Sequence, residues 1–254
     1  MSNNKVPKKV KPVRAGAGVK NPRQTSSVVT YVLAGLAIVV VIAVVAIGIV
    51  ANHKDKTTKS LPEDQLKQTT LYTAVKPGAN PKATLDLYED FQCPACQQFE
   101  KQFGAQIVQA INDGTLSVRY HMVNFLDKSG KYSSRAAGAA KAVAAENNVD
   151  LYLNFHTKLY DQQPPETDAN GLSNEQLAQI AASVGASPAT QQAIATQSLD
   201  SGNVADASSL ADASLKQMSD LLGASNVSTP SAVYQGKVYT KYQTDPNWLS
   251  ELTK

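Results

Sequence analysis

The pattern of hydrophobic and polar residues divides the chain into four regions. Residues 1–27 are rich in Lys, Pro, Gly, Asn and Ser and lack an apolar period, so we expect a disordered tail. Residues 28–51 form an apolar run without ionisable side chains, long enough to cross a ~30 Å hydrocarbon core as one transmembrane helix. Cleavage after this run is the alternative. Residues 52–80 read as a linker, and residues 81–254 as the folded domain.

The folded domain begins with a β-α-β pattern. Residues 84–88 alternate as a strand does, and a helix is expected to begin at about Pro94. The apolar residues of this helix follow one another at intervals of four, on one slowly drifting face: Phe99, Phe103, Ile107 and Ile111. A second alternating strand follows: Leu116, Val118, Tyr120 and Met122. The first strand-to-helix turn is therefore predicted to hold the two cysteines, Cys93 and Cys96.

A helical block and a short β-β-α unit complete the pattern. From about residue 128 to 223 the spacing is helical, with a capping-box pair at Ser173 and Gln176 and a helix start at Ser187 and Pro188. Two strands joined by a tight turn are predicted at residues 231–234 and 237–239. A last helix is expected from Pro246.

The charge is unevenly distributed along the chain. The first 27 residues carry seven of the 24 basic residues and no acid, which leaves 24 − 7 = 17 basic against 21 acidic residues downstream. Basic residues beside an apolar run favour a cytoplasmic N-terminus, with residues 52–254 outside the cytoplasm. We therefore expect a cell-membrane protein that contacts the lipid bilayer, and no nucleic-acid partner.

The two cysteines of the chain lie three positions apart, at Cys93 and Cys96. At the N-terminus of a helix, unpaired backbone N–H groups and the positive end of the helix dipole favour the thiolate of Cys93. A zinc site would need four ligands and would have to recruit His121 and His156. A purely structural disulfide would close too small a loop to constrain the unfolded chain. We therefore favour redox chemistry, with no metal and no cofactor beyond the Cys93–Cys96 disulfide.

Residues 83–254 resemble the thioredoxin superfamily in its DsbA-like branch. Two motifs carry the resemblance: Asp90-Phe91-Gln92-Cys93-Pro94-Ala95-Cys96, and Ser228-Thr229-Pro230-Ser231 before a strand and a Gly236-Lys237 turn. The resemblance implies an α/β thioredoxin-like fold with a helical insertion. A transmembrane anchor is typical of actinobacterial members of this branch.

The resemblance also implies roles for individual residues. Cys93 is the nucleophile and Cys96 the resolving thiol, while Pro94 and Ala95 separate them. Pro230 is expected to follow a cis peptide bond and to face the cysteines, and Thr229 to present its backbone to an extended substrate. Ala95 stands where the best-known DsbA motif has a histidine that stabilises the thiolate, which leaves the direction of electron flow open. Ser228 stands where many relatives have glycine.

Acidic and aromatic residues beside the cysteines allow more than one interpretation. Glu89 and Asp90 precede the motif, and an acid there could relay protons to or from Cys96. We expect Glu89 to be a solvated surface residue, whereas Asp90 fits a proton relay and surface solvation equally. Phe91 is a candidate substrate contact, and Tyr88 and Phe99 could likewise border a peptide groove; each could instead belong to the core.

The sequence thus predicts a membrane-anchored extracytoplasmic thiol:disulfide oxidoreductase. We expect an oxidase that introduces disulfides into exported proteins with reduced cysteines. A quinone-linked membrane partner, DsbB-like or VKOR-like, would reoxidise it. One alternative is a reductase of the same fold, for example in cytochrome maturation. Another is a redox-inert anchored protein that uses the helical block as a binding surface.

Overall fold

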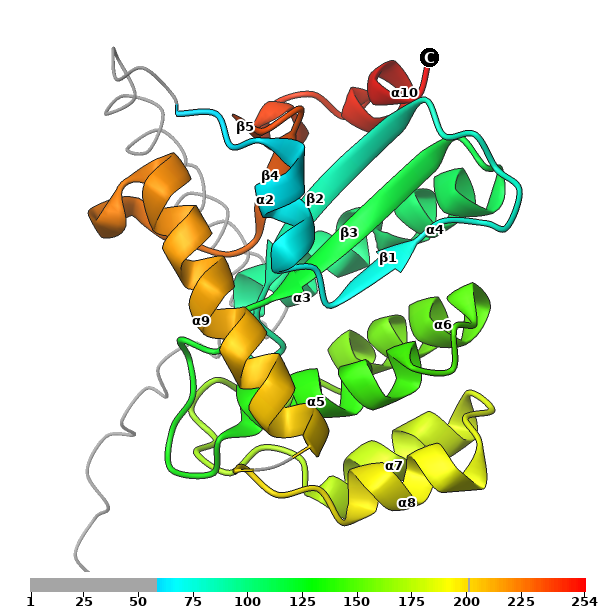
Figure 1. The fold of residues 1–254 in the computed structure, drawn as a ribbon, viewed down its shortest axis with the longest axis vertical. Coiled ribbons are helices and arrows are strands. Elements are labelled where there is room, and N and C mark those ends of the chain that lie inside the picture. Colours follow the sequence, from blue (N-terminus) through cyan, green and yellow to red (C-terminus); the bar gives the residue numbers. More distant parts are fainter. Residues whose placement is uncertain (1–58, 201) are drawn as a thin grey trace, which may run out of the picture. The chain divides into compact units, whose positions relative to one another are not determined.

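The computed structural model describes residues 59–200 and 202–254, drawn in colour in Figure 1. Every described residue belongs to one compact unit of the chain. The predicted tail and transmembrane helix, residues 1–51, lie outside the described residues. Within the described part of the chain, no helix combines the length and the apolar character needed to cross a membrane.

A five-stranded sheet forms the centre of the domain, with its strands in the order β1-β3-β2-β4-β5. The strands are β1 (Tyr72–Ala74), β2 (Ala83–Glu89), β3 (Leu116–Met122), β4 (Ser231–Tyr234) and β5 (Lys237–Tyr239). β2 and β3 are parallel, whereas the other neighbouring strands are antiparallel. The carboxyl end of β2 therefore lies between the end of β3 and the beginning of β4, where side chains from three strands can meet.

Residues 59–80 belong to the folded domain, so the prediction of a linker over 52–80 is wrong for this part. Helix α2 (Glu63–Gln68) buries Leu66, and strand β1 pairs with β3. The backbone N–H of Leu61 donates to the carbonyl of Gly236 at 2.9 Å. A Cβ at position 236 would lie 2.2 Å from the Leu61 carbonyl oxygen, so this crossing requires glycine. The segment crosses the sheet from the β4–β5 turn to the opposite edge.

The helix after β2 contains a π-helical segment. It consists of α3 (Pro94–Phe99), the π-helix η1 (Glu100–Gly104) and α4 (Ala105–Asn112). In a regular α-helix of 3.6 residues per turn, residues four apart drift by about 40° per step. A π turn holds more residues than an α turn and offsets this drift. The residues predicted at intervals of four are consequently all buried: Phe99, Phe103, Ile107 and Ile111.

The predicted helical block lies between β3 and β4. It contains α5 (Tyr132–Ala144), α6 (Val149–Asp161), α7 (Asn174–Ser183), α8 (Pro188–Ala195) and α9 (Gly202–Leu222). Figure 1 shows α5 to α8 packed together on one side of the sheet, with α9 running back towards the sheet. The capping box of Ser173 with Gln176 and the helix start at Ser187 and Pro188 are confirmed. The helical insertion is therefore confirmed.

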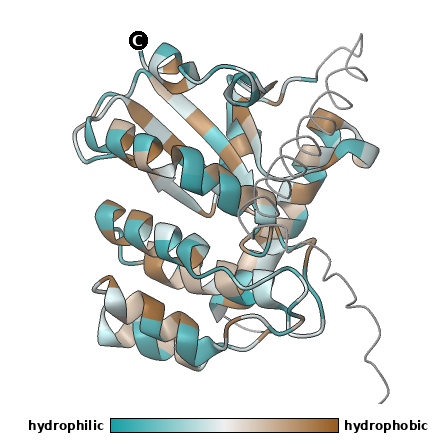
Figure 2. Cartoon of the chain, turned by 180° about the vertical axis from the view of Figure 1, so that it is seen from behind, coloured by the Kyte–Doolittle hydropathy of each residue, from teal (hydrophilic) through white to brown (hydrophobic). Residues whose placement is uncertain are grey.

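The C-terminal unit follows the predicted β-β-α order. Gln235 and Gly236 form the β4–β5 turn, the 3-10 helices η2 (Ala224–Asn226) and η3 (Lys241–Gln243) flank the two strands, and α10 (Trp248–Leu252) buries Trp248. The buried hydrophobic residues form two clusters. The larger one contains Leu85 and Leu87, and the smaller contains Tyr88 with residues of α2 and α9. Figure 2 shows hydrophobic residues along the strands, and hydrophobic and hydrophilic residues on the helices.

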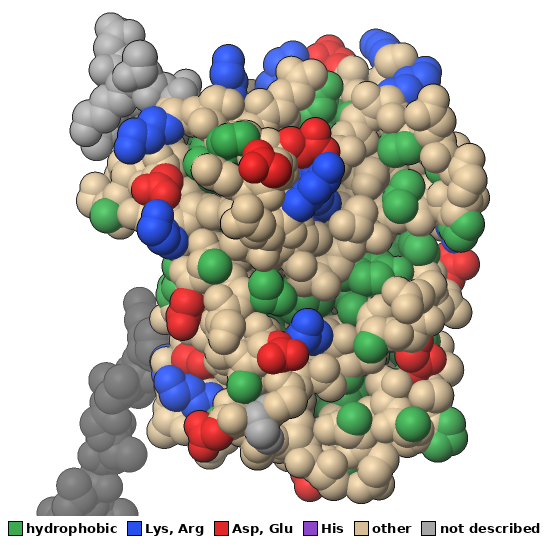
Figure 3. All heavy atoms as spheres, viewed as in Figure 1, with side chains coloured by type: hydrophobic (Ala, Val, Ile, Leu, Met, Phe, Trp, Pro, Cys, Tyr) green, Lys and Arg blue, Asp and Glu red, His purple; other side chains and the backbone are tan. Residues whose placement is uncertain are grey.

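Charged side chains of both signs are interspersed on the face seen in Figure 3. Neither described histidine is exposed: His121 is completely buried and His156 is 2% exposed. Both histidines therefore take part in interactions inside the domain.

Candidate active site

Cys93 and Cys96 lie at the start of α3, directly beyond the carboxyl end of β2. Cys93 is the N-cap residue, with an extended backbone, and Pro94 occupies the first helical position, where a missing N–H costs no hydrogen bond. Both cysteines are free thiols; Cys93 is 7% exposed and Cys96 is fully buried. A substrate sulfur can therefore reach Cys93 but not Cys96.

The two thiols differ strongly in acidity. The pKa of Cys93 is lowered to about 6, mainly by a hydrogen bond from Cys96, which outweighs the effect of burial. The Thr229 side chain and the backbone N–H groups of Ala95 and Cys96 lower it further. Burial raises the pKa of Cys96 well above its usual value. This difference suits Cys93, rather than Cys96, to act as a nucleophile. Backbone N–H groups at the helix N-terminus thus contribute to the lowered pKa of Cys93, although position 95 holds alanine and not histidine.

The Thr229–Pro230 peptide faces Cys93, as the resemblance implied. This peptide bond is cis, and the Cys93 thiol donates to the Thr229 carbonyl at 3.5 Å. The loop is held from two sides: Tyr242 donates to the Pro230 carbonyl at 3.1 Å, and the Ser231 hydroxyl donates to the Ser228 carbonyl at 2.6 Å. The structure thus brings together the two motifs on which the resemblance rests.

Asp90 fixes the backbone of the cysteine turn. Its carboxylate accepts hydrogen bonds from the Gln92 N–H at 2.8 Å, the Ser133 hydroxyl at 2.6 Å and the Leu126 N–H at 3.2 Å. Burial raises its pKa to about 6, although these donors act in the opposite direction. The buried carboxylate rules out the alternative of surface solvation. A proton relay through Asp90 stays a prediction.

Glu89 is not the solvated surface residue that we expected. It is completely buried, and its Oε2 lies 3.0 Å from His156 Nε2, across the boundary between sheet and insertion. Glu100 joins the pair, with Oε2 3.9 Å from His156 Nδ1. Burial raises the pKa of Glu89, raises that of Glu100 to about 8 and lowers that of His156. Three titratable groups therefore lie near the buried thiol.

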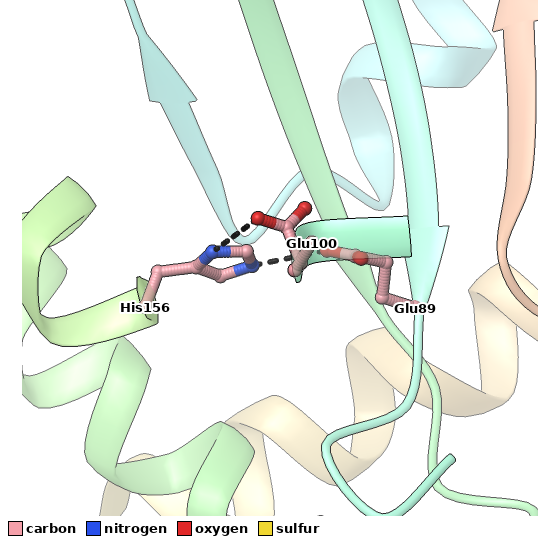
Figure 4. A group of neighbouring side chains, drawn as sticks. All are labelled: Glu89, Glu100 and His156. Atoms are coloured by element: carbon pink, nitrogen blue, oxygen red, sulfur yellow. Dashed lines mark hydrogen bonds and ion pairs between the residues drawn. The ribbon is translucent and has the colours of Figure 1, made fainter. Parts of the chain in front are cut away.

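Glu100 was missed by the sequence analysis, although a signal for it exists. It follows the buried Cys96 by four positions, which places both on one face of a helix. Gly104 leaves room for it, because a Cβ at position 104 would lie 2.6 Å from Glu100 Oε2. Figure 4 shows Glu89, Glu100 and His156 pointing towards one another from a strand and two helices.

His121 takes no part in this group, which removes the zinc alternative that needed both histidines. Neighbouring residues of a strand point to opposite faces of the sheet. Tyr120 contacts His156, with ring centroids 4.5 Å apart, whereas His121 stacks on Tyr88 on the other face at 4.3 Å. The nitrogens of His121 lie within hydrogen-bonding distance of Asp86 and Thr69.

Phe91 was a candidate substrate contact or a core residue, and its burial places it in the core. It is 1% exposed and packs against Tyr160, with ring centroids 5.3 Å apart. Tyr88 and Phe99 are also buried. The exposed aromatic residue beside the cysteine turn is Phe125, 43% exposed. Its loop is joined to the turn because the Val123 N–H donates to the Glu89 carbonyl and the Leu126 N–H to Asp90.

The fold and the cysteine site define a thiol–disulfide oxidoreductase of the thioredoxin fold with a helical insertion. Residues 78–253 match the family model Thioredoxin_4, described as Thioredoxin. The chain belongs to this thioredoxin family.

Solved structures give the branch of the family. MdbA, a thiol-disulfide oxidoreductase from Corynebacterium diphtheriae, aligns over 79% of this chain and 96% of its own, with a TM-score of 0.61 and 24% identity, a likeness of fold. Reduced DsbA from Mycobacterium tuberculosis aligns over 70% of this chain and 85% of its own, with a TM-score of 0.56 and 29% identity. Together with the cysteine site, these likenesses identify a DsbA-like protein disulfide oxidoreductase.

One curated relative is a much longer protein. The serine/threonine-protein kinase PknE of Mycobacterium tuberculosis is 34% identical over 174 residues, which are 66% of this chain and 29% of the kinase. This chain therefore spans less than a third of that relative's length.

Proposed function

We propose that the chain is an oxidase that introduces disulfides into exported proteins through the Cys93–Cys96 couple. The observation that carries this proposal is the difference in acidity between an accessible Cys93 and a buried Cys96. A stabilised Cys93 thiolate favours the reduced form of the couple, which makes the disulfide more oxidising. Thiolate stability therefore supports an oxidase over a reductase.

The exchange takes place in two steps. A substrate thiolate attacks Cys93 Sγ, the Cys93–Cys96 bond breaks, and Cys96 leaves with the electron pair and takes up a proton. A second substrate thiolate then attacks the substrate sulfur of this mixed disulfide, and Cys93 leaves as the thiolate. The substrate loses two electrons and the couple gains them. The Thr229 backbone beside Cys93 is suited to align an extended substrate strand.

The rest of the chain supports an extracytoplasmic position for this reaction. The basic residues of 1–27 and the apolar run of 28–51 fit a single-pass anchor with a cytoplasmic N-terminus. A compartment outside the cytoplasm is oxidising enough to keep disulfides formed. A quinone-linked membrane partner, DsbB-like or VKOR-like, would accept the two electrons and regenerate the disulfide.

The test is an equilibrium of the full chain with glutathione, followed by oxidative refolding of a reduced, unfolded substrate. We expect a potential well above the about −270 mV of thioredoxin, and refolding that Cys93→Ser abolishes. Cys96→Ala should accumulate mixed disulfides with the substrate. A potential near that of thioredoxin with no refolding would favour the reductase. A couple that exchanges with neither glutathione nor substrate would favour the redox-inert binding protein.

A further inference from the structure

The cluster of Glu89, Glu100 and His156 contains buried polar atoms that lack partners. Glu89 Oε1 and Glu100 Oε1 are both buried without a hydrogen bond, and the side chains are 0% and 7% exposed. The hydroxyl groups of Tyr152 and Tyr160, which interact electrostatically with both carboxyl groups, also lack partners. Buried polar groups without partners are costly, so each needs an explanation.

The cluster also lacks a compensating cation. Among residues 59–200 and 202–254, no Lys or Arg forms an ion pair with Glu89 or Glu100; His156 is the only basic side chain paired with them. Two carboxyl groups, joined by a side-chain hydrogen bond, and one imidazole thus lie together with little exposure to solvent. A bound cation would supply the missing charge and occupy the unpartnered oxygens.

The arrangement of the three side chains suits a metal ion. Each offers one ligand atom, and these atoms lie within 4.8 Å of one another. Zinc binds carboxylate oxygen and imidazole nitrogen at about 2.0–2.2 Å, so ligation needs a contraction of roughly an ångström. The side chains come from β2, η1 and α6, and Figure 4 shows that they converge. Gly104 keeps the space that the Glu100 carboxylate occupies.

We propose that Glu89, Glu100 and His156 form a binding site for one divalent transition-metal ion of the zinc class, near the buried Cys96. This departs from the expectation of no metal drawn from the sequence. The site differs from the zinc alternative considered there, because neither His121 nor a cysteine is a ligand. It joins the sheet to the helical insertion, since His156 lies on α6.

The test measures Zn²⁺ bound by the full chain in its oxidised form, in which the Cys93–Cys96 disulfide leaves no thiol to bind the metal. The chain is treated with chelator, dialysed against Zn²⁺ and assayed by elemental analysis. We expect one equivalent in the unmodified chain. Glu100→Gln should lose that equivalent, and Glu251→Gln, which changes an exposed carboxylate, should keep it.

A thermal melt with and without Zn²⁺ gives a second measurement that does not depend on redox activity. Specific binding should raise the melting temperature of the unmodified chain and of Glu251→Gln, but not that of Glu100→Gln. Gly104→Ala, which leaves all three ligands in place, should weaken binding by displacing Glu100. No bound zinc in the unmodified chain, or equal amounts in Glu100→Gln, would overturn the proposal and assign the unpartnered oxygens to protons and water.

Discussion

Two buried polar clusters lie on opposite faces of strand β2, and they differ in charge balance. On one face, Asp86 accepts from Arg119 Nε at 2.6 Å and Nη2 at 2.7 Å, and its Oδ1 lies 2.8 Å from His121 Nε2. On the other face, Glu89 and Glu100 have only His156 as a basic partner. Both clusters are buried, but only the second borders the thiols.

This difference shows which buried charges point to function. Asp86 illustrates the balanced case: burial alone would raise its pKa, yet the hydrogen bonds from Arg119 and His121 lower the pKa below its usual value. Its network joins β2 to β3 and, through Thr69 and Gln217, to the segment after α2 and to α9. A compensated cluster of this kind holds elements together. A buried cluster without a balancing cation has perturbed pKa values and carboxylate oxygens without partners. Such perturbed groups are found most often at functional sites.

The largest expected effect comes from unbalancing the Asp86 cluster with Arg119→Met. The variant leaves a buried carboxylate without its main partner, so we expect a loss of about 3–5 kcal/mol in the free energy of unfolding, measured by urea denaturation. The control is Lys216→Met, which removes the cation of an exposed pair with Asp220 and should cost about 0.5 kcal/mol or less.

The pH dependence of the same variant follows from the sign of the Asp86 shift. In the unmodified protein the pKa of Asp86 is lowered, so its contribution is present at neutral pH and is lost only as the pH falls through the folded-state pKa. Without Arg119, burial raises this pKa, and the stability of the variant should increase as the pH falls from 8 to 5. A stability gap that stays constant over this range would contradict the assignment of Arg119 as the balancing charge.

The second effect has the opposite sign. Glu100→Gln removes one of two uncompensated buried carboxyl groups, and Gln can fill the same space. In the presence of a chelator we expect the variant to be more stable than the unmodified chain by about 1–3 kcal/mol, measured by urea denaturation. Glu251→Gln, with an exposed side chain, should change stability by no more than about 0.5 kcal/mol. If Glu100→Gln instead lowered the stability, the charges of the Glu89, Glu100 and His156 cluster would be balanced in the unmodified chain.

The contrast between the two faces also shows what the sequence can predict. The cysteine turn was identified by the spacing of Cys93 and Cys96, and the loop that faces it by the Thr229–Pro230 pair. The core helix was identified by the apolar residues at intervals of four after Pro94. Those signals are local or periodic. The pairing of Glu89 with His156 could not be read in this way, because the two residues are 67 positions apart and meet only when the insertion packs on the sheet.

The sequence also could not predict which aromatic side chains are exposed or where the shortest strand lies. Phe91 and Phe125 are both aromatic residues near the motif, and nothing in residue type tells which is buried. Strand β1 has three residues, too few for an alternation to be recognised, and its pairing with β3 is decided by tertiary packing. The predicted transmembrane run lies outside the described residues and stays a prediction.

A smaller effect is expected on the reactive thiol itself. Thr229→Val removes the hydroxyl that lowers the pKa of Cys93, and it keeps the shape of the side chain; this hydroxyl has no other partner in the structure and is free to donate to the thiolate. The pKa of Cys93, about 6 in the unmodified chain, should rise by roughly one unit, since a hydrogen bond to a charged group contributes about 1.5–3 kcal/mol and neighbouring donors can replace part of it. The pH profile of Cys93 alkylation measures this value. Thr229→Ser, which keeps the hydroxyl, should leave the midpoint unchanged. Equal midpoints for the unmodified chain and both variants would show that the Thr229 hydroxyl does not lower the pKa of Cys93.

The smallest effect concerns recognition of the substrate at the thiol end of the sheet. Phe125 is 43% exposed on the loop that hydrogen-bonds to Asp90, and Leu199, 44% exposed between α8 and α9, provides a matched control. Covering the exposed part of a phenylalanine contributes about 1 kcal/mol, so Phe125→Ser should raise the KM for an unfolded protein substrate roughly fivefold. Its rate with glutathione should not change, because so small a thiol does not extend to Phe125. Leu199→Ser should alter neither rate. Equal losses in the two variants would mean that exposed apolar surface in general, and not this loop next to the cysteine turn, attracts the substrate.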